Sequence, residues 1–304
     1  MTALDVLIKV GGDRVEEHAQ LGALTTYRVG GRARCLVRVS SDSDLAELSP
    51  LMAATELPLF VLGNGSNVLV ADGETPLVAL RLGGQFASLR WHRGDGGVTV
   101  EAGAAIELPV AARRLAHDGV TGLEWAVGVP GTFGGAAKMN AGGHGSDVAA
   151  TILSARVWRA GTEESWGKDR LALGYRTSAL QSGDVVLGVT MALRAGAASE
   201  CEERVRDVVR WRRENQPGGH NAGSVFRNPP NDSAARLIDL VGGKGLRVGS
   251  ASVSEKHANF IQADSGGRAS DVYQLISLLR DRVREASGVD LASEHHFVGF
   301  GDGQ

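Results

Sequence analysis

Two clusters of glycine carry the first residues that could do chemistry. Residues 63–67 (GNGSN) follow an apolar run, and successive backbone N–H groups in a tight turn there can form a nest for an anion such as a pyrophosphate. The segment is not the G-x-G-x-x-G sequence of dinucleotide-binding folds, because no third glycine follows at the required spacing. A polar turn between two strands is the alternative for this segment taken alone.

The second cluster, residues 127–145, is too rich in glycine to predict a core helix or strand. Small residues here would let a flat, bulky ligand lie against the main chain, and Thr132 and Asn140 would offer it hydrogen bonds. A long mobile loop is the alternative, although apolar residues such as Val127 and Phe133 are more typical of a packed segment. Together the two clusters indicate a large nucleotide cofactor, and the lack of a Walker A sequence argues against phosphoryl transfer.

The elements that must position these loops mix strands and helices. We predict a strand over residues 34–39, a helix over 43–54 capped by Ser41 or Asp42, and a strand over 57–62 that ends at the first glycine cluster. Further strands are expected at 68–71, 154–159 and 185–193, and further helices at 108–117, 200–215, 233–241 and 269–287. The pattern predicts an α+β protein.

Two of these helices are predicted to be amphipathic. The expected buried residues of helix 200–215 are Val205, Val208, Val209 and Trp211, and those of helix 269–287 are Val272, Leu275, Ile276, Leu279 and Val283. Because the composition changes near residue 199, we expect three domains, over residues 1–72, 73–198 and 199–290. A C-terminal strand within residues 291–304 is expected to return near the active site.

Composition excludes several classes of protein. The 304-residue chain carries a net charge of −3, so it has no positive field with which to collect nucleic acid. Its two cysteines, Cys35 and Cys201, form neither a disulfide framework nor a metal-ligand pattern, so no metal is expected. No signal peptide and no apolar run of about 20 residues is found, so we expect a cytoplasmic protein that is not inserted in a membrane.

Six motifs in fixed order resemble those of the UDP-N-acetylenolpyruvoylglucosamine reductases, bacterial enzymes that make a peptidoglycan precursor. They are residues 25–31 (TTYRVGG), 63–67, 128–135 (GVPGTFGG), 174–178 (GYRTS), 222–229 (AGSVFRNP) and 254–260 (SEKHANF). The resemblance runs from about residue 20 to residue 300. It implies an FAD-binding fold of the vanillyl-alcohol-oxidase type, in which two α+β subdomains hold FAD and a C-terminal α+β domain binds the substrate.

The resemblance also implies the reaction. NADPH would reduce a non-covalently bound FAD, and the reduced flavin would then reduce the enolpyruvyl ether of UDP-N-acetylglucosamine to give UDP-N-acetylmuramate. The expected partners are therefore this substrate and NADPH, without nucleic acid, and we expect a monomer.

Three catalytic residues follow from motif matches to the family. Arg176 matches the active-site arginine, Ser224 the proton-donating serine and Glu294 the C-terminal glutamate, which would help to stabilise the enolate as a protonated acid. Without the resemblance, these side chains would be interpreted as a surface arginine, a turn hydroxyl and an exposed carboxylate. The substrate is expected to contact these three residues together with Tyr175, Asn228 and His257.

The same motifs predict the residues that bind the cofactor. They lie in the first motif and in the two glycine clusters, and they are Tyr27, Arg28, Gly63, Asn64, Gly65, Ser66, Asn67, Gly128, Pro130, Gly131, Thr132, Gly134, Gly135, Asn140 and Gly142. Arg227 and Lys256 are further candidates for contacts with the substrate diphosphate or the nicotinamide nucleotide.

Two departures from the family are visible. Asn215 stands where members commonly have lysine, so phosphate recognition is expected to fall to Arg212 or Arg213. The short chain between Tyr175 and Glu200 resembles the compact subclass without a tyrosine-bearing lid. The alternatives are another FAD-linked oxidase of this fold, with His144 as the candidate for covalent attachment, or a catalytically silent nucleotide-binding homologue.

Overall fold

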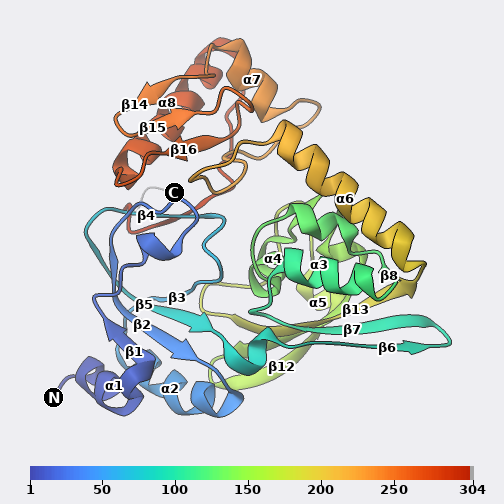
Figure 1. Cartoon of the computed structure of the whole chain (residues 1–304). Coiled ribbons are helices and arrows are strands. Elements are labelled where there is room, and N and C mark those ends of the chain that lie inside the picture. The colour runs from blue at the N-terminus through green and yellow to red at the C-terminus, as the bar shows by residue number, and fades with distance from the viewer. Residues whose placement is uncertain (302–304) are drawn as a thin grey trace. The chain divides into compact units, whose positions relative to one another are not determined.

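The computed structural model describes residues 1–301, and the chain forms two compact units, each with its own core (Figure 1). Unit 1 consists of Met1–Glu17, Cys35–Asn64 and Leu77–Arg212. Unit 2 consists of His18–Arg34, Gly65–Pro76 and the chain from Arg213 onward. The division into three domains stays a prediction, and residues 302–304 of the predicted C-terminal strand lie outside the described residues.

The first sheet of unit 1 has the strand order β1–β2–β5–β3, with β1 antiparallel to β2 and β3 parallel to β5. Its strands are β1 (Val15–Glu17), β2 (Arg32–Val39), β3 (Leu59–Val61) and β5 (Glu74–Leu82), and its helices are α1 (Ala3–Gly11) and α2 (Asp42–Ala54). Helix α2 begins where predicted, because the Ser41 side chain accepts from the Asp44 N–H in a capping box. Leu7, Leu45 and Leu48 bury the helices against this sheet.

The second sheet of unit 1 is antiparallel, in the order β12–β11–β13–β7–β6, with β8 paired to the end of β13. Its strands are β6 (Leu89–Gly94), β7 (Gly97–Gly103), β8 (Val120–Thr121), β11 (Ile152–Arg159), β12 (Thr162–Gly167) and β13 (Val185–Ala195). Helices α3 (Leu108–His117), α4 (Phe133–Met139) and α5 (Lys168–Leu171) accompany them, with the short pair β9 (Gly142–Gly143) and β10 (Ser146–Asp147). Figure 1 shows α3 and α4 side by side beyond β7 and β13.

Helix α4 corrects one prediction, because it lies inside the glycine cluster that was expected to contain no core helix. Its Phe133 is 1% exposed and packs in the core of unit 1. A Cβ on Gly134 would lie only 3.2 Å from the Cβ of Ala104, so glycine lets the helix approach its neighbour closely. Tertiary packing therefore outweighs the low helix propensity of glycine.

Helix α6 (Ala198–Asn215) corrects a second prediction, because its buried face is narrower than expected. Val205 is buried and Val208 is half-buried, as predicted, but Val209 and Trp211 are 39% and 47% exposed. Cys201 completes the buried face instead, one turn before Val205. A helix that packs on one side only buries a single narrow stripe, and the positions next to that stripe face solvent.

The described residues of unit 2 include two small sheets and two α-helices. Strand β4 (Val68–Val70) pairs in parallel with β17 (His296–Val298), and β14 (Arg247–Val248), β15 (Ala251–Val253) and β16 (Ile261–Ala263) form an antiparallel sheet. The helices are α7 (Ala234–Leu240) and α8 (Ala269–Ser287). All five predicted apolar residues of α8 are buried, and Gly288 ends the helix in a left-handed conformation with φ of 71°.

Candidate functional site

The two glycine clusters meet in unit 1. A Cβ placed on Gly63 would lie 2.7 Å from Oγ1 of Thr132, which is closer than real contacts allow, so the first cluster packs directly on the second. Thr132 is 6% exposed and precedes α4, and its side chain makes no capping hydrogen bond to that helix. Two segments 69 positions apart in the sequence therefore form one surface of unit 1.

Arg176 lies at the tip of a tight turn, where Gly174 and Thr177 exchange backbone hydrogen bonds of 3.1 and 3.2 Å. Its guanidinium donates to the carbonyl oxygen of Gly142 at 2.9 Å and to that of Asn140 at 3.4 Å. The exposed ring of Tyr175 lies 5.3 Å from the same guanidinium. The turn therefore holds the predicted catalytic arginine against the second glycine cluster.

Asn140 joins the second glycine cluster to this turn. Its side chain is almost completely buried, donates to the Gly174 carbonyl at 2.9 Å and accepts from the Ala149 N–H at 2.9 Å. Lys138 makes a second connection between the cluster and the chain after the turn, because its ammonium donates to the carbonyl of Leu180 at 2.6 Å. Burial lowers the pKa of this lysine. Asn140 therefore acts as a structural junction beside Arg176.

In unit 2 the end of the first glycine cluster packs on the first motif. Gly65 has φ of 59°, a conformation that favours glycine, and a Cβ there would lie 2.6 Å from Cα of Thr25. The Thr26 N–H donates to the Gly65 carbonyl at 3.2 Å. Tyr27 is completely buried, whereas Arg28 is exposed. The structure therefore brings residues 25–28 and 65–67 together.

Asn67 connects this loop to the C-terminal strand. Its side-chain nitrogen donates to the Glu294 carbonyl at 2.8 Å, and its own carbonyl accepts from the His296 N–H at 3.0 Å. Glu294 is half-buried. The pairing of β4 with β17 places the predicted catalytic glutamate at the end of the predicted cofactor loop.

Ser224 belongs to the same part of unit 2. The Glu294 N–H donates to the carbonyl of Val225 at 2.7 Å, and Phe226 and Ser293 form an antiparallel bridge. The buried Asn259 holds this segment from the other side, because its amide donates to Phe226 O at 2.8 Å. Ser224 and Glu294 are therefore neighbours across paired backbone, while Arg176 belongs to unit 1.

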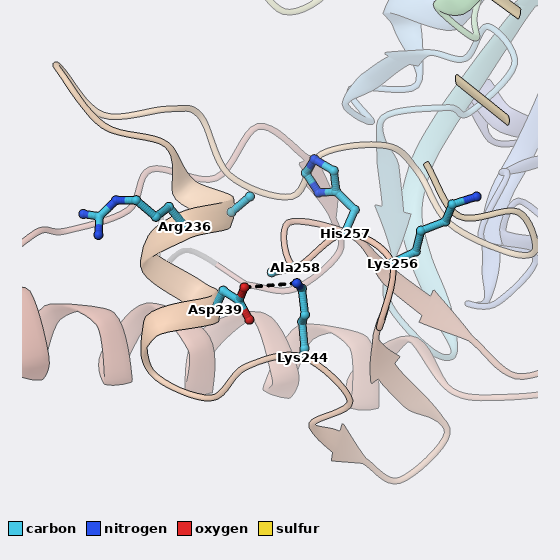
Figure 2. Close-up of a pocket in the computed structure, with 7 residues that line it drawn as sticks. Arg236, Asp239, Lys244, Lys256, His257 and Ala258 are labelled. Carbon is cyan, nitrogen blue, oxygen red and sulfur yellow. Dashed lines mark ion pairs between the residues drawn. The ribbon is translucent and has the colours of Figure 1, made fainter. Parts of the chain in front are cut away.

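A pocket of about 330 Å³ in unit 2 is lined by residues of α7 and of the loop after β15. Figure 2 shows the Lys244 ammonium paired with Asp239, at 3.0 Å, with His257 on the loop above them. Burial, together with the charge of Lys244, lowers the pKa of His257. Asn228 does not line this pocket, and its side-chain oxygen accepts from the Ala234 N–H at the start of α7.

Comparison with known proteins finds two matching families and several similar proteins. The family described as UDP-N-acetylenolpyruvoylglucosamine reductase, C-terminal domain, matches residues 215–298, and the FAD binding domain family matches residues 33–164. UDP-N-acetylenolpyruvoylglucosamine reductase of Rubrobacter xylanophilus is 39% identical over 277 residues, which are 90% of this chain and 92% of that protein. The protein of the same name from Paramagnetospirillum magneticum is 39% identical, over 97% of this chain and 95% of its own.

The chain belongs to the UDP-N-acetylenolpyruvoylglucosamine reductase family. The crystal structure of the Thermus caldophilus reductase has a TM-score of 0.81 and 38% identity, covering 94% of this chain and 99% of that one. These matches confirm the predicted family and its α+β FAD-binding fold. The protein is an FAD-dependent oxidoreductase of peptidoglycan precursor synthesis, and its cofactor is FAD.

The residues of this reductase fold fit a bound FAD. Gly63 and Gly65 sit where any side chain would collide with the second cluster or with the first motif, so the main chain itself must form the surface of the loop. Of the nine non-glycine residues with positive φ in residues 1–301, three are predicted site residues: Arg28, Asn140 and Arg176. Strained backbone conformations of this kind are common at sites that bind ligands.

Neither a membrane-spanning helix nor a metal-binding cluster is found within residues 1–301. Within residues 1–301, no helix is long and apolar enough to cross a bilayer. In the same part of the chain, no group of three or more His, Cys, Asp and Glu side chains is arranged to hold a metal ion.

Sequence reasoning missed several residues that support the site. The unpredicted members are Lys138, Arg236, Lys244, Asn259 and His295. Asn259 lies within the motif at residues 254–260, and His295 directly follows the predicted catalytic Glu294, so both positions could have been noticed from the sequence. The others lie outside the motifs, and only their contacts in three dimensions reveal them.

Proposed function

We propose that this reductase uses NADPH to reduce its FAD and then reduces UDP-N-acetylglucosamine enolpyruvate to UDP-N-acetylmuramate. One observation carries the proposal: Asn67 of the cofactor loop donates to the Glu294 carbonyl, and the Glu294 N–H donates to the residue next to Ser224. Hydrogen bonds to the Glu294 main chain thus hold the cofactor loop, Glu294 and the segment of Ser224 together. Because the motifs of a bacterial precursor enzyme are present, we also propose a cytoplasmic location.

Once reduced by NADPH, the bound FAD would supply hydride from its N5 position. Arg176 binds the carboxylate of the enolpyruvyl group, where negative charge grows as the double bond is reduced. A positive charge already in place stabilises the negative charge of the transition state more than it stabilises the bound substrate. Bonds from the guanidinium to the carbonyls of Asn140 and Gly142 orient it for this role.

Ser224 supplies the proton that completes the reduction. A hydroxyl is a weak acid in water, but it suffices against a carbanion-like intermediate when it is positioned next to it. Glu294 donates a hydrogen bond to the same developing charge as a protonated acid. Both side chains are half-buried, so water is only partly excluded around them.

The pocket beside His257 binds the anionic part of a nucleotide. Three cations and one carboxylate line it, Arg236, Lys244, Lys256 and Asp239. Asp239 pairs with Lys244 and Asp232 pairs with Arg236, so the excess charge is that of Lys256, whose ammonium donates to the Arg213 carbonyl. Nδ1 of His257 lies 3.2 Å from the Asn259 N–H and accepts from it, which directs the other ring nitrogen away from that bond. Such a site suits a diphosphate. Asn215, Arg212, Arg213 and Arg227 stay separate candidates for contacts with the phosphates or the nicotinamide nucleotide.

Stopped-flow absorbance of the flavin tests the role of Ser224. Ser224→Ala should leave reduction of FAD by NADPH within about twofold of wild type and slow its reoxidation by the enolpyruvyl substrate by at least about a hundredfold. Ser252→Ala, on strand β15 of the same unit, is the matched control. If both half-reactions were unchanged in Ser224→Ala, Ser224 would have no part in the reaction.

Arg176→Lys tests the arginine separately. A lysine keeps the charge but loses the planar pair of donors that matches a carboxylate, so turnover should fall by about a hundredfold or more. Steady consumption of NADPH that depends on the enolpyruvyl substrate is the measurement. Turnover equal to wild type in this variant would reject the assigned role.

The nearest competing function is an FAD-linked oxidase that returns electrons to oxygen. His144 is its candidate for covalent attachment, and here that residue is exposed, with its ring beside Gly128 and the Trp211 ring, at 4.9 Å between ring centroids. Acid precipitation separates the two cases. Release of all the flavin into the supernatant supports non-covalent binding, whereas flavin that stays with the protein supports the oxidase.

A further inference from the structure

Asn67 is the point at which unit 2 ties the cofactor loop to the end of the chain. Its backbone carbonyl accepts from His296, and its side-chain nitrogen donates to the Glu294 carbonyl. The side-chain oxygen of Asn67 is therefore the remaining polar atom of the amide. That oxygen lies 3.0 Å from Nδ1 of His295.

His295 is buried between Asn67 and Tyr27. The imidazole is 6% exposed and the Tyr27 side chain is 0% exposed. Nε2 of His295 lies 3.0 Å from the Tyr27 hydroxyl, and the two rings meet edge to face with centroids 5.6 Å apart. Tyr27, His295, Asn67 and the Glu294 carbonyl therefore form one continuous hydrogen-bonded chain.

The chemistry of these groups allows only one direction for the protons in that chain. A carbonyl oxygen only accepts, so the Asn67 nitrogen must face Glu294 and the Asn67 oxygen must face His295. Nδ1 of His295 must then carry the proton that it donates to Asn67. Burial and the neighbouring charge of His296 lower the pKa of His295 to about 3, so the ring is neutral and Nε2 accepts from the Tyr27 hydroxyl.

We propose that His295 is a positioning residue whose Nδ1–H tautomer, with Nε2 accepting from the Tyr27 hydroxyl, keeps the Asn67 amide pointing at the Glu294 main chain. If the ring carried its proton on Nε2, Nδ1 would accept and the Asn67 amide would have to turn over. Its oxygen would then face the Glu294 carbonyl oxygen, and the two acceptors would repel. His295 thus acts on the cofactor loop and on Glu294 through the Asn67 amide.

The effect on the reaction rests on the proposed function, whereas the tautomer does not. NMR of protein with ¹⁵N-labelled histidine distinguishes the two tautomers of a neutral ring, and His295→Gln assigns the signal among the eight histidines of the chain. We expect a protonated Nδ1 and an unprotonated Nε2 at pH 7. A ring protonated on Nε2, or on both nitrogens, would overturn the proposal.

Tyr27→Phe removes the hydroxyl that donates to Nε2 of His295 and leaves the buried ring in place. We expect Nδ1 to keep its proton and the Nε2 signal to shift because that nitrogen loses its hydrogen bond. FAD binding should weaken by about two- to tenfold, and reoxidation of the flavin by substrate should slow by a similar factor. A purely structural role for Tyr27 would lower the melting temperature and leave FAD affinity and flavin reoxidation at their wild-type values.

Tyr273→Phe is the matched control, because it makes the same chemical change in the same unit. Tyr273 packs on the rings of Phe297 and Phe300 and takes no part in the chain of hydrogen bonds. Equal Nε2 signals of His295 and equal FAD affinities in the two variants would refute the role of His295. A wild-type protein that never turned over the enolpyruvyl substrate would contradict the proposed function alone, because the NMR and FAD measurements do not depend on it.

Discussion

Gly63→Ala is the sharpest perturbation of the contact between the two glycine clusters. Gly63 does not have a left-handed backbone, so the backbone itself accepts alanine. The new Cβ, however, would lie 2.7 Å from Oγ1 of Thr132, about 0.7 Å inside ordinary van der Waals contact at 3.4 Å. One of the two segments must then move.

The expected cost follows from two opposing effects. Overpacking of a close contact costs about 1–3 kcal/mol, and replacing glycine by alanine recovers about 0.4–1 kcal/mol by restricting the unfolded chain. The free energy of unfolding of the apoprotein should therefore fall by about 1–2 kcal/mol. Urea denaturation monitored by tryptophan fluorescence measures it, and FAD titration reports whether the cofactor loop has moved.

A second substitution shows whether Thr132 is the cause. In Gly63→Ala with Thr132→Ala, the nearest remaining Thr132 atom is Cβ at 3.7 Å, so the clash disappears and the stability should return. Removal of Oγ1 costs no cap, because Thr132 makes no side-chain capping bond. Gly63→Ala with Thr132→Val keeps an atom in the Oγ1 position and should stay destabilised. Equal stability of the alanine and valine double variants would refute the reasoning.

Three other perturbations test the support of the site. Asn140→Ala removes the hydrogen bonds to Gly174 and Ala149 and leaves an alanine at φ of 40°. The free energy of unfolding in urea should therefore fall by about 3 kcal/mol, and a fall of less than about 1 kcal/mol would contradict this expectation. Asp72→Ala removes the carboxylate that accepts from two N–H groups at the start of α8, at 3.0 Å each, and should cost about 1–2 kcal/mol, with Asp281→Ala as a surface control. Because the folded pKa of His295 is depressed to about 3, its stabilising contribution is complete above about pH 6.5 and falls as the pH falls towards 3. Wild type should therefore lose about 2 kcal/mol more than His295→Gln between pH 7 and pH 5, and equal losses would show that the ring does not resist protonation.

Regular periodicity predicted the long elements well. Helices α3 and α8 begin and end at the predicted residues, because their apolar side chains recur at the helical spacing and recognisable residues end them. Helix α4 was not predicted, because burial of Phe133 stabilises it and the helix propensity of its glycines is low. The exposed Trp211 was misplaced for the related reason that a helix alone does not reveal how wide its packed face is.

The ordered motifs alone determined the family, the FAD cofactor and the residues expected to act, because each motif preserves residue types that the chemistry requires. Only the tertiary structure decided which of them meet. Asn67 lies next to Glu294 across 227 positions of sequence, and Tyr27 reaches His295 across 268. Such contacts depend on the pairing of β4 with β17 and on burial in a shared core, and no local pattern encodes a partner so far along the chain. Which atom donates the proton in each of these hydrogen bonds is determined only when both partners are in place.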